Sequence, residues 1–228
     1  MKLQDRHIVN ARIAERGTSL VEVLVSLVIL GLGVLSVVAL QLVSKRNTGD
    51  ASAQTYASQL SYGTIERMRM NSSTAALTQY EVTASNGLGR GQQGATEPTP
   101  TCTSGSPCQP TQLAIHDLWL FEQMLDGAAE TTGAGATLAK TGGLVNPTAC
   151  ITGPAAGAAG VYTVTIVWKS KTPIPNPTGY DNTFCGYNAT DASGNSLYGS
   201  AADCQAMTGN ATATADCFRR AVQFQTFI

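Results

Sequence analysis

The chain has 228 residues, of which 43% are hydrophobic and 13% charged, and its formal net charge is −1. Fourteen basic residues against 15 acidic ones leave no basic excess, which argues against a dedicated nucleic-acid-binding protein. Mean hydropathy is close to zero, at +0.01. Such an average describes either a uniform soluble protein or an oily segment joined to a polar one.

One apolar stretch near the N-terminus decides between these two readings. Residues 23–44 contain no Asp, Glu, Lys or Arg. As a helix they would extend roughly 33 Å, enough to cross a hydrocarbon core of about 30 Å. The alternative is a buried core helix, but such a helix normally keeps a polar face, which this stretch lacks. We therefore expect a membrane-spanning helix.

The residues on either side of this stretch predict its orientation and its fate. Residues 1–17 carry four basic and two acidic side chains, which predicts that this end stays in the cytoplasm and that the rest is exported. A secretory signal would end in a small-residue cleavage site. Residues 43–50 (VSKRNTGD) do not form such a site, so we expect the span to remain in the mature protein.

Six cysteines lie beyond the apolar stretch, an even number in the half predicted to face an oxidising compartment. No Cys-x-x-Cys pair is present, which argues against zinc and favours disulfides. Six cysteines allow 15 pairings, and the sequence does not choose among them. Spacing favours a local bridge between Cys102 and Cys108; a second between Cys204 and Cys217 would leave Cys150 for Cys185.

Glu22 is the one ionisable residue at the start of the oily segment. An acid there costs free energy, less near an end of the span than at its centre. It could simply sit at the headgroup level, or it could await a charged partner. The surrounding sequence RGTSLVEVLVSLVIL (16–30) resembles the class III signal of type IV pilins and pseudopilins, in which a basic leader ends in Gly and the fifth mature residue is Glu.

This resemblance implies a specific processing pathway. Prepilin peptidase would cut between Gly17 and Thr18 on the cytoplasmic side and N-methylate the new amine of Thr18. The family most often has Phe at that first mature position, so Thr18 departs from the pattern. The Glu22 carboxylate would then pair with the amine of a neighbouring subunit, which relieves the burial cost of both charges and fixes the axial register.

Five further stretches resemble the PilV type of minor pilin: VVALQ, IERMRMN, LAIHDLW, YTVTIVW and the terminal RRAVQFQTFI. The resemblance implies an α+β, type IV pilin-like fold, with a long N-terminal helix packed on a small antiparallel sheet head whose loops are pinned by disulfides. Four segments are expected: a cleaved leader (1–17), a transmembrane assembly helix (18–44), its amphipathic continuation (45–72), and a periplasmic or extracellular head (73–228).

Local patterns place the elements of the head. Ala53, Ala57, Leu60, Thr64 and Met68 recur at helical spacing, so we expect the helix to continue over 51–70, with a bend or break at Gly49 and an end at 71–73. We expect loops at 83–110, 127–143 and 170–216. A helix is expected at 111–126, capped by Thr111, and strands are expected at 144–151, 161–169 and 218–227.

Nothing in the sequence indicates an enzyme, a metal site or a cofactor. Of the two histidines, His7 would leave with the leader, and His116 reads as a surface or half-buried helix residue beside Asp117. Gly105-Ser106-Pro107 is not a nucleophile elbow, and the glycines of 87–91 lie in a loop rather than between a strand and a helix.

The resemblance implies a minor type IV pilin that helps to initiate the pilus and caps it. Its partners would be other minor pilins, the major pilin, prepilin peptidase, the inner-membrane assembly platform and a tip adhesin, with a membrane and without nucleic acid. It would be a single-pass inner-membrane precursor and then part of the pilus at the cell surface. The alternatives are a minor pseudopilin of a type II secretion system and an uncleaved, membrane-anchored periplasmic adhesin or sensor.

Overall fold

The computed structural model describes residues 19–83, 87–128, 130–133, 139–174, 185–187, 189–211 and 215–228. The chain divides into two compact units, residues 1–45 and 46–228. One long helix, α1 (Leu20–Met70), contributes residues to both units. The confirmed fold class is α+β and type IV pilin-like: a long N-terminal helix, a small antiparallel sheet and disulfide-pinned loops.

The C-terminal half of α1 is amphipathic, as its sequence pattern predicts. Its buried residues are Ala57, Leu60, Ser61, Thr64, Ile65 and Met68, which recur every three or four positions and so lie on one face. The helix ends at Met70, and the Asn71 side chain donates a hydrogen bond of 2.7 Å to the carbonyl oxygen of Pro110. Gly49 does not break α1, contrary to expectation.

The continuity of α1 at Gly49 has a physical cause in the next residue. The Asp50 carboxylate accepts hydrogen bonds from Ser170 Oγ (2.9 Å) and from the backbone N–H of Lys171 (3.2 Å). These two contacts attach the helix to the segment that follows the central strand. A glycine costs only about 1 kcal/mol inside a helix, so two such bonds are enough to offset it.

Three antiparallel strands form the main sheet in the order β3–β4–β5. They are β3 (Thr148–Thr152), β4 (Val161–Lys169) and β5 (Arg219–Phe227), within a few residues of the expected strands. β4 alternates in sequence, and the side chains of Tyr162, Val164, Ile166 and Trp168 are all buried. The oily face of β4 therefore faces the core, as the alternation predicts.

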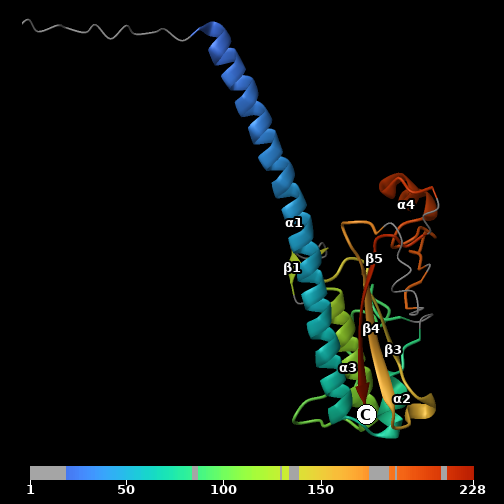
Figure 1. The fold of residues 1–228 in the computed structure, drawn as a ribbon. Helices are drawn as coiled ribbons and strands as arrows, with labels where there is room; N and C mark the ends of the chain where they lie inside the picture. The colour runs from blue at the N-terminus through green and yellow to red at the C-terminus, as the bar shows by residue number, and fades with distance from the viewer. Residues whose placement is uncertain are drawn as a thin grey trace, which may run out of the picture. The chain divides into compact units, whose positions relative to one another are not determined.

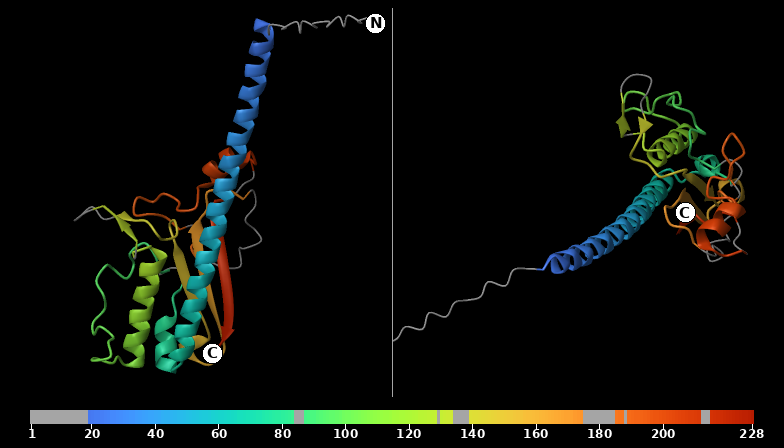
Figure 2. Two further views of the ribbon diagram at one scale, coloured as in Figure 1. Left: turned by 90° about the vertical axis from the view of Figure 1, so that its left-hand side faces the viewer. Right: turned by 90° about the horizontal axis from the view of Figure 1, so that it is seen from above.

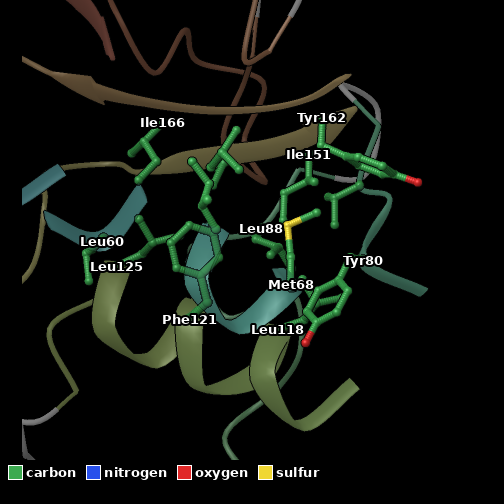
Figure 3. Packing of buried hydrophobic residues seen from close by; sticks show 14 of the residues in the cluster. Leu60, Met68, Tyr80, Leu88, Leu118, Phe121, Leu125, Ile151, Tyr162 and Ile166 are labelled. Carbon is green, nitrogen blue, oxygen red and sulfur yellow. The ribbon is translucent and has the colours of Figure 1, made fainter. Parts of the chain in front are cut away.

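Two helices join α1 on this face of the sheet (Figure 1): α2 (Thr74–Tyr80) and α3 (Pro110–Leu125). Figure 3 shows Leu118, Phe121 and Leu125 of α3 pointing toward the strands that carry Ile151 and Ile166. α3 begins one residue before the predicted helix, and Thr111 is not its cap. Pro110 needs no acceptor at the first helical position, and the backbone N–H of Gln109 donates to Gln112 Oε1 (2.9 Å).

The opposite face of the sheet carries a smaller cluster of buried side chains, in which Val167, Leu197 and Tyr198 pack around the disulfide between Cys150 and Cys185. The other two disulfides join Cys102 to Cys108 and Cys204 to Cys217. Each of these two disulfides closes a loop with few apolar residues. The covalent bond therefore constrains a segment that buries little apolar surface.

Two α-helices and two short strands are absent from the sequence-based expectations. α2 follows the end of α1 directly, and β1 (Thr131–Thr132) pairs with β2 (Ala139–Lys140) inside a predicted loop. α4 (Ala201–Thr208) lies inside the predicted loop 170–216. Its one buried residue is Cys204, so it has no apolar periodicity; a capping box between Ser200 and Asp203 starts it instead.

Candidate functional site

The N-terminal half of α1 exposes an unusual amount of apolar surface. Every Leu, Val and Ile between Leu20 and Val43 is exposed, with side-chain accessibilities from 46% to 77%. A contiguous apolar surface of this size normally contacts a membrane or a partner. By length and composition α1 is also able to cross a membrane. This surface is the first part of the candidate site.

Glu22 lies in the first turn of α1 and is exposed. A carboxylate in the first turn interacts favourably with the partial positive charge of the helix N-terminus. Ser26 Oγ donates to the carbonyl oxygen of Glu22 (2.7 Å) and so leaves the carboxylate available. The predicted cleavage residues Gly17 and Thr18 lie outside the described residues. Glu22 is therefore the one predicted assembly residue that the structure places.

A second group of polar residues holds the three helices of the head together. The Asp117 carboxylate of α3 forms an ion pair with Arg67 of α1, with Nη1 and Oδ1 3.0 Å apart. It also accepts a hydrogen bond from the hydroxyl of Tyr80 of α2. Tyr80 is fully buried and Asp117 nearly so. One carboxylate thus joins α1, α2 and α3.

The Tyr80 hydroxyl should make the head sensitive to alkaline pH. Burial, and then the hydrogen bond to Asp117, raise the pKa of Tyr80 above its ordinary value of 10.0. The folded state therefore favours the neutral phenol, so stability is fully present below pH 10 and is lost as pH rises beyond it. In Tyr80→Phe, the unfolding free energy should fall less steeply above pH 10, by about 1.4 kcal/mol per pH unit.

Tryptophan fluorescence during urea unfolding of the full chain in detergent measures this slope, because Trp119 and Trp168 both lie in the head. Tyr187→Phe is the matched control, since it removes the same hydroxyl from a ring that is 52% exposed. Equal slopes for the wild type and Tyr80→Phe would contradict the prediction.

Two further acids, Glu122 in the last turn of α3 and Asp126 directly after the helix, hold a glycine-rich loop. The Glu122 carboxylate is fully buried and accepts the backbone N–H groups of Gly89 (2.8 Å), Gln92 (2.7 Å) and Gln93 (2.5 Å). Asp126 accepts those of Arg90 (2.7 Å) and Gly91 (2.9 Å). The backbone N–H groups of five consecutive residues, 89–93, thus donate to two carboxylates that lie one helical turn apart. These contacts fix the loop onto the C-terminal turn of α3.

The sequence contains a signal for these residues, although the sequence analysis missed their role. Asp117, Glu122 and Asp126 lie in or beside a largely apolar helix, without a Lys or Arg between 111 and 126 to pair with them. Buried charges need partners, so unpaired acids in an apolar helix predict contacts from elsewhere in the chain. The identity of those partners depends on the tertiary structure.

His116 Nε2 lies 2.9 Å from Glu97 Oε1 on a partly buried face of α3, as expected for a helix residue of structural role. Among the described residues, no group of three or more His, Cys, Asp or Glu side chains could hold a metal ion.

Comparison with known proteins identifies one family. The model of the Tt1218-like family, described as type IV pilin Tt1218, matches residues 39–119, which cover the second half of α1, α2 and most of α3. Neither a curated protein nor a solved structure matches the chain.

Proposed function

We propose that this chain, a member of the type IV pilin superfamily, is a minor pilin that helps to initiate the pilus and caps it. A pilin role in general follows from the family, whose members are structural and non-catalytic. The observation that carries the proposal is the exposed apolar half of α1 with a single acid, Glu22, in its first turn.

This role would give each segment of the chain a different task. Residues 1–17 would be a leader removed before assembly, and residues 18–44 would cross the membrane and later pack against neighbouring helices in the pilus. The C-terminal half of α1 has its apolar side already covered by the head, so it is not available for the same use. The head would face the periplasm in the precursor and the cell surface afterwards.

Pairing between Glu22 and the amine of a neighbouring subunit would give the assembly its register. Neither charge is solvated in hydrocarbon, so an unpaired amine and an unpaired carboxylate both cost free energy there. Pairing relieves both costs only when adjacent helices are offset by the correct axial distance. The neighbours would be other minor pilins and the major pilin, brought together by the inner-membrane assembly platform, with an adhesin at the tip.

N-terminal processing tests this proposal directly. We expect the mature chain, purified from membranes, to begin at Thr18 and to carry one added methyl group, as measured by intact mass and N-terminal sequencing. Gly17→Leu should block cleavage and keep the chain out of sheared pili. Asn10→Ala, a change inside the leader but away from the junction, should leave both unchanged. An uncut chain beginning at Met1 would instead favour a membrane-anchored adhesin or sensor.

A further inference from the structure

Among the residues that the structure describes, the outer strand of the sheet has one edge without a backbone partner. β5 is the last strand in the order β3–β4–β5, and Figure 2 (left) shows it at the outside of the sheet. It pairs with β4 along its whole length, from Val161 opposite Phe227 to Lys169 opposite Arg219. The backbone groups on the other edge of β5 do not take part in this pairing.

The hydrogen-bond pattern shows which groups that edge presents. Gly160 and Ile228 exchange both backbone hydrogen bonds, at 2.8 and 3.0 Å. In an antiparallel ladder such pairs alternate with pairs that form no hydrogen bonds. The N–H and C=O groups that point away from β4 are therefore those of Ala221, Gln223, Gln225 and Phe227. Within the described part of the chain, no backbone group bonds to these four residues.

This edge lacks the features that usually protect an exposed strand. Natural edge strands are protected by charges, proline or a bulge, because an open edge pairs readily with another chain. The sequence of β5 from Ala221 onward is AVQFQTF, without a charge or a proline. Its register with β4 is continuous, so it contains no bulge.

The side chains beside the edge favour an apolar occupant. Tyr62 of α1 contacts Phe224 with ring centroids 4.4 Å apart, yet Tyr62 is 56% exposed. Two turns further along α1, Arg69 donates to Thr226 Oγ1 (2.7 Å) and to Glu66 (2.8 Å). A strand added to β5 would lie over this row and would cover the open side of the Tyr62 ring.

A hollow lies where the edge ends. It has a volume of about 520 Å³, and Phe227, Ile228, Arg69 and Leu77 are among its lining residues. The Phe227 side chain beside it is 74% exposed. A partner segment that lay along β5 and extended past its end would reach this hollow. The hollow is large enough to accept one side chain of that segment.

We propose that the open edge of β5 binds an extended segment of a different protein of the same filament, added as a fourth strand. The segment would be uncharged over about seven residues, with apolar side chains at the alternate positions that face Tyr62. That the protein carrying this segment is a pilus component rests on the proposed function. The strand addition itself rests on the open edge alone.

A second copy of this chain fits this edge less well than a different protein. Tyr62 lies beside Phe224 and Arg69 beside Thr226, so α1 and β5 run in the same direction in the head. Antiparallel pairing of two β5 strands would turn the two 46–70 helix segments in opposite directions. On the proposed function the subunits of one filament share one orientation, so this arrangement does not suit two assembled copies.

Photocrosslinking in pilus-bearing cells tests the proposal. A benzophenone amino acid in place of Gln223 should give one product with another protein, with the linkage in an uncharged segment. Gln225→Pro removes one outward N–H and no bond to β4, and should lower the yield about tenfold. Gln225→Ala keeps that N–H and should leave the yield unchanged. Benzophenone in place of Thr131, which is exposed on β1 in the separate two-stranded sheet, should not give this product.

Three results would overturn the proposal: a product made of two copies of this chain, a yield that Gln225→Pro leaves unchanged, or no product although the chain is present in the membrane. Unfolding midpoints of the two Gln225 variants should equal that of the wild type, which separates loss of binding from loss of folding. A product found in membranes while the chain is missing from sheared pili would support the strand addition and contradict the pilin role.

Discussion

Replacement of Glu22 by Gln should lower the amount of this chain in sheared pili about a hundredfold, while its amount in the membrane stays unchanged. The change keeps the size of the side chain and removes its charge. The amine of the neighbouring subunit would then lie unpaired in hydrocarbon, at a cost of about 2.5–3.5 kcal/mol. That cost corresponds to roughly two orders of magnitude in an equilibrium.

The comparison should use immunoblots of pilus and membrane fractions from the same cells. Glu130→Gln is a matched control, since it makes the same chemical change at an exposed position of the head. Glu22→Asp keeps the charge on a shorter side chain and should restore part of the incorporation. If Glu22→Gln entered pili as well as the wild type, the carboxylate would have no role in docking.

Replacement of Glu122 by Gln should cost the head about 3–5 kcal/mol of unfolding free energy. The carboxylate accepts three backbone N–H groups of the 89–93 loop, and it is fully buried. A glutamine amide has one acceptor oxygen and an NH₂ group, so at least one N–H of the loop would face a donor instead of an acceptor. Total domain stabilities are only about 5–15 kcal/mol, so this loss is a large fraction of the whole.

Urea unfolding of the full chain in detergent, followed by tryptophan fluorescence, measures the loss. Glu66→Gln is the matched control, because Glu66 is exposed on α1 and forms an ion pair with Arg69, one turn away. Exposed pairs of this kind contribute less than about 1 kcal/mol. A loss below 1 kcal/mol for Glu122→Gln would show that the loop does not depend on the buried carboxylate.

Most secondary structure of the head could be predicted because it follows local periodicity. Alternating residues gave the strand at 161–169 with correct bounds, and residues spaced by three or four gave α1 up to Met70. α4 could not be found in this way, because its sequence buries one residue, Cys204, and its start depends on a cap. Gly49 was misjudged because the bonds from Asp50 to Ser170 and Lys171 connect residues 120 positions apart.

The sequence also predicts assembly residues, Glu22 and the Gly17–Thr18 junction, through the resemblance of one short segment to the signal of type IV pilins. It did not identify the partners of the buried acids. Asp117 meets Arg67 and Tyr80, while Glu122 meets a loop some thirty residues earlier in the chain. Such pairings depend on how the helices cross, which no local pattern encodes.

By itself, the sequence determined the composite nature of this protein: a basic N-terminal segment, an apolar helix with one acid in its first turn, and a polar head with six cysteines. These properties depend on neighbouring residues, so they are readable without a fold. The tertiary structure alone decided the strand order β3–β4–β5, and with it that the uncharged strand β5 is the open edge. Strand order results from contacts between distant segments, since α1, α2 and α3 must all bury their apolar faces on one side of the sheet.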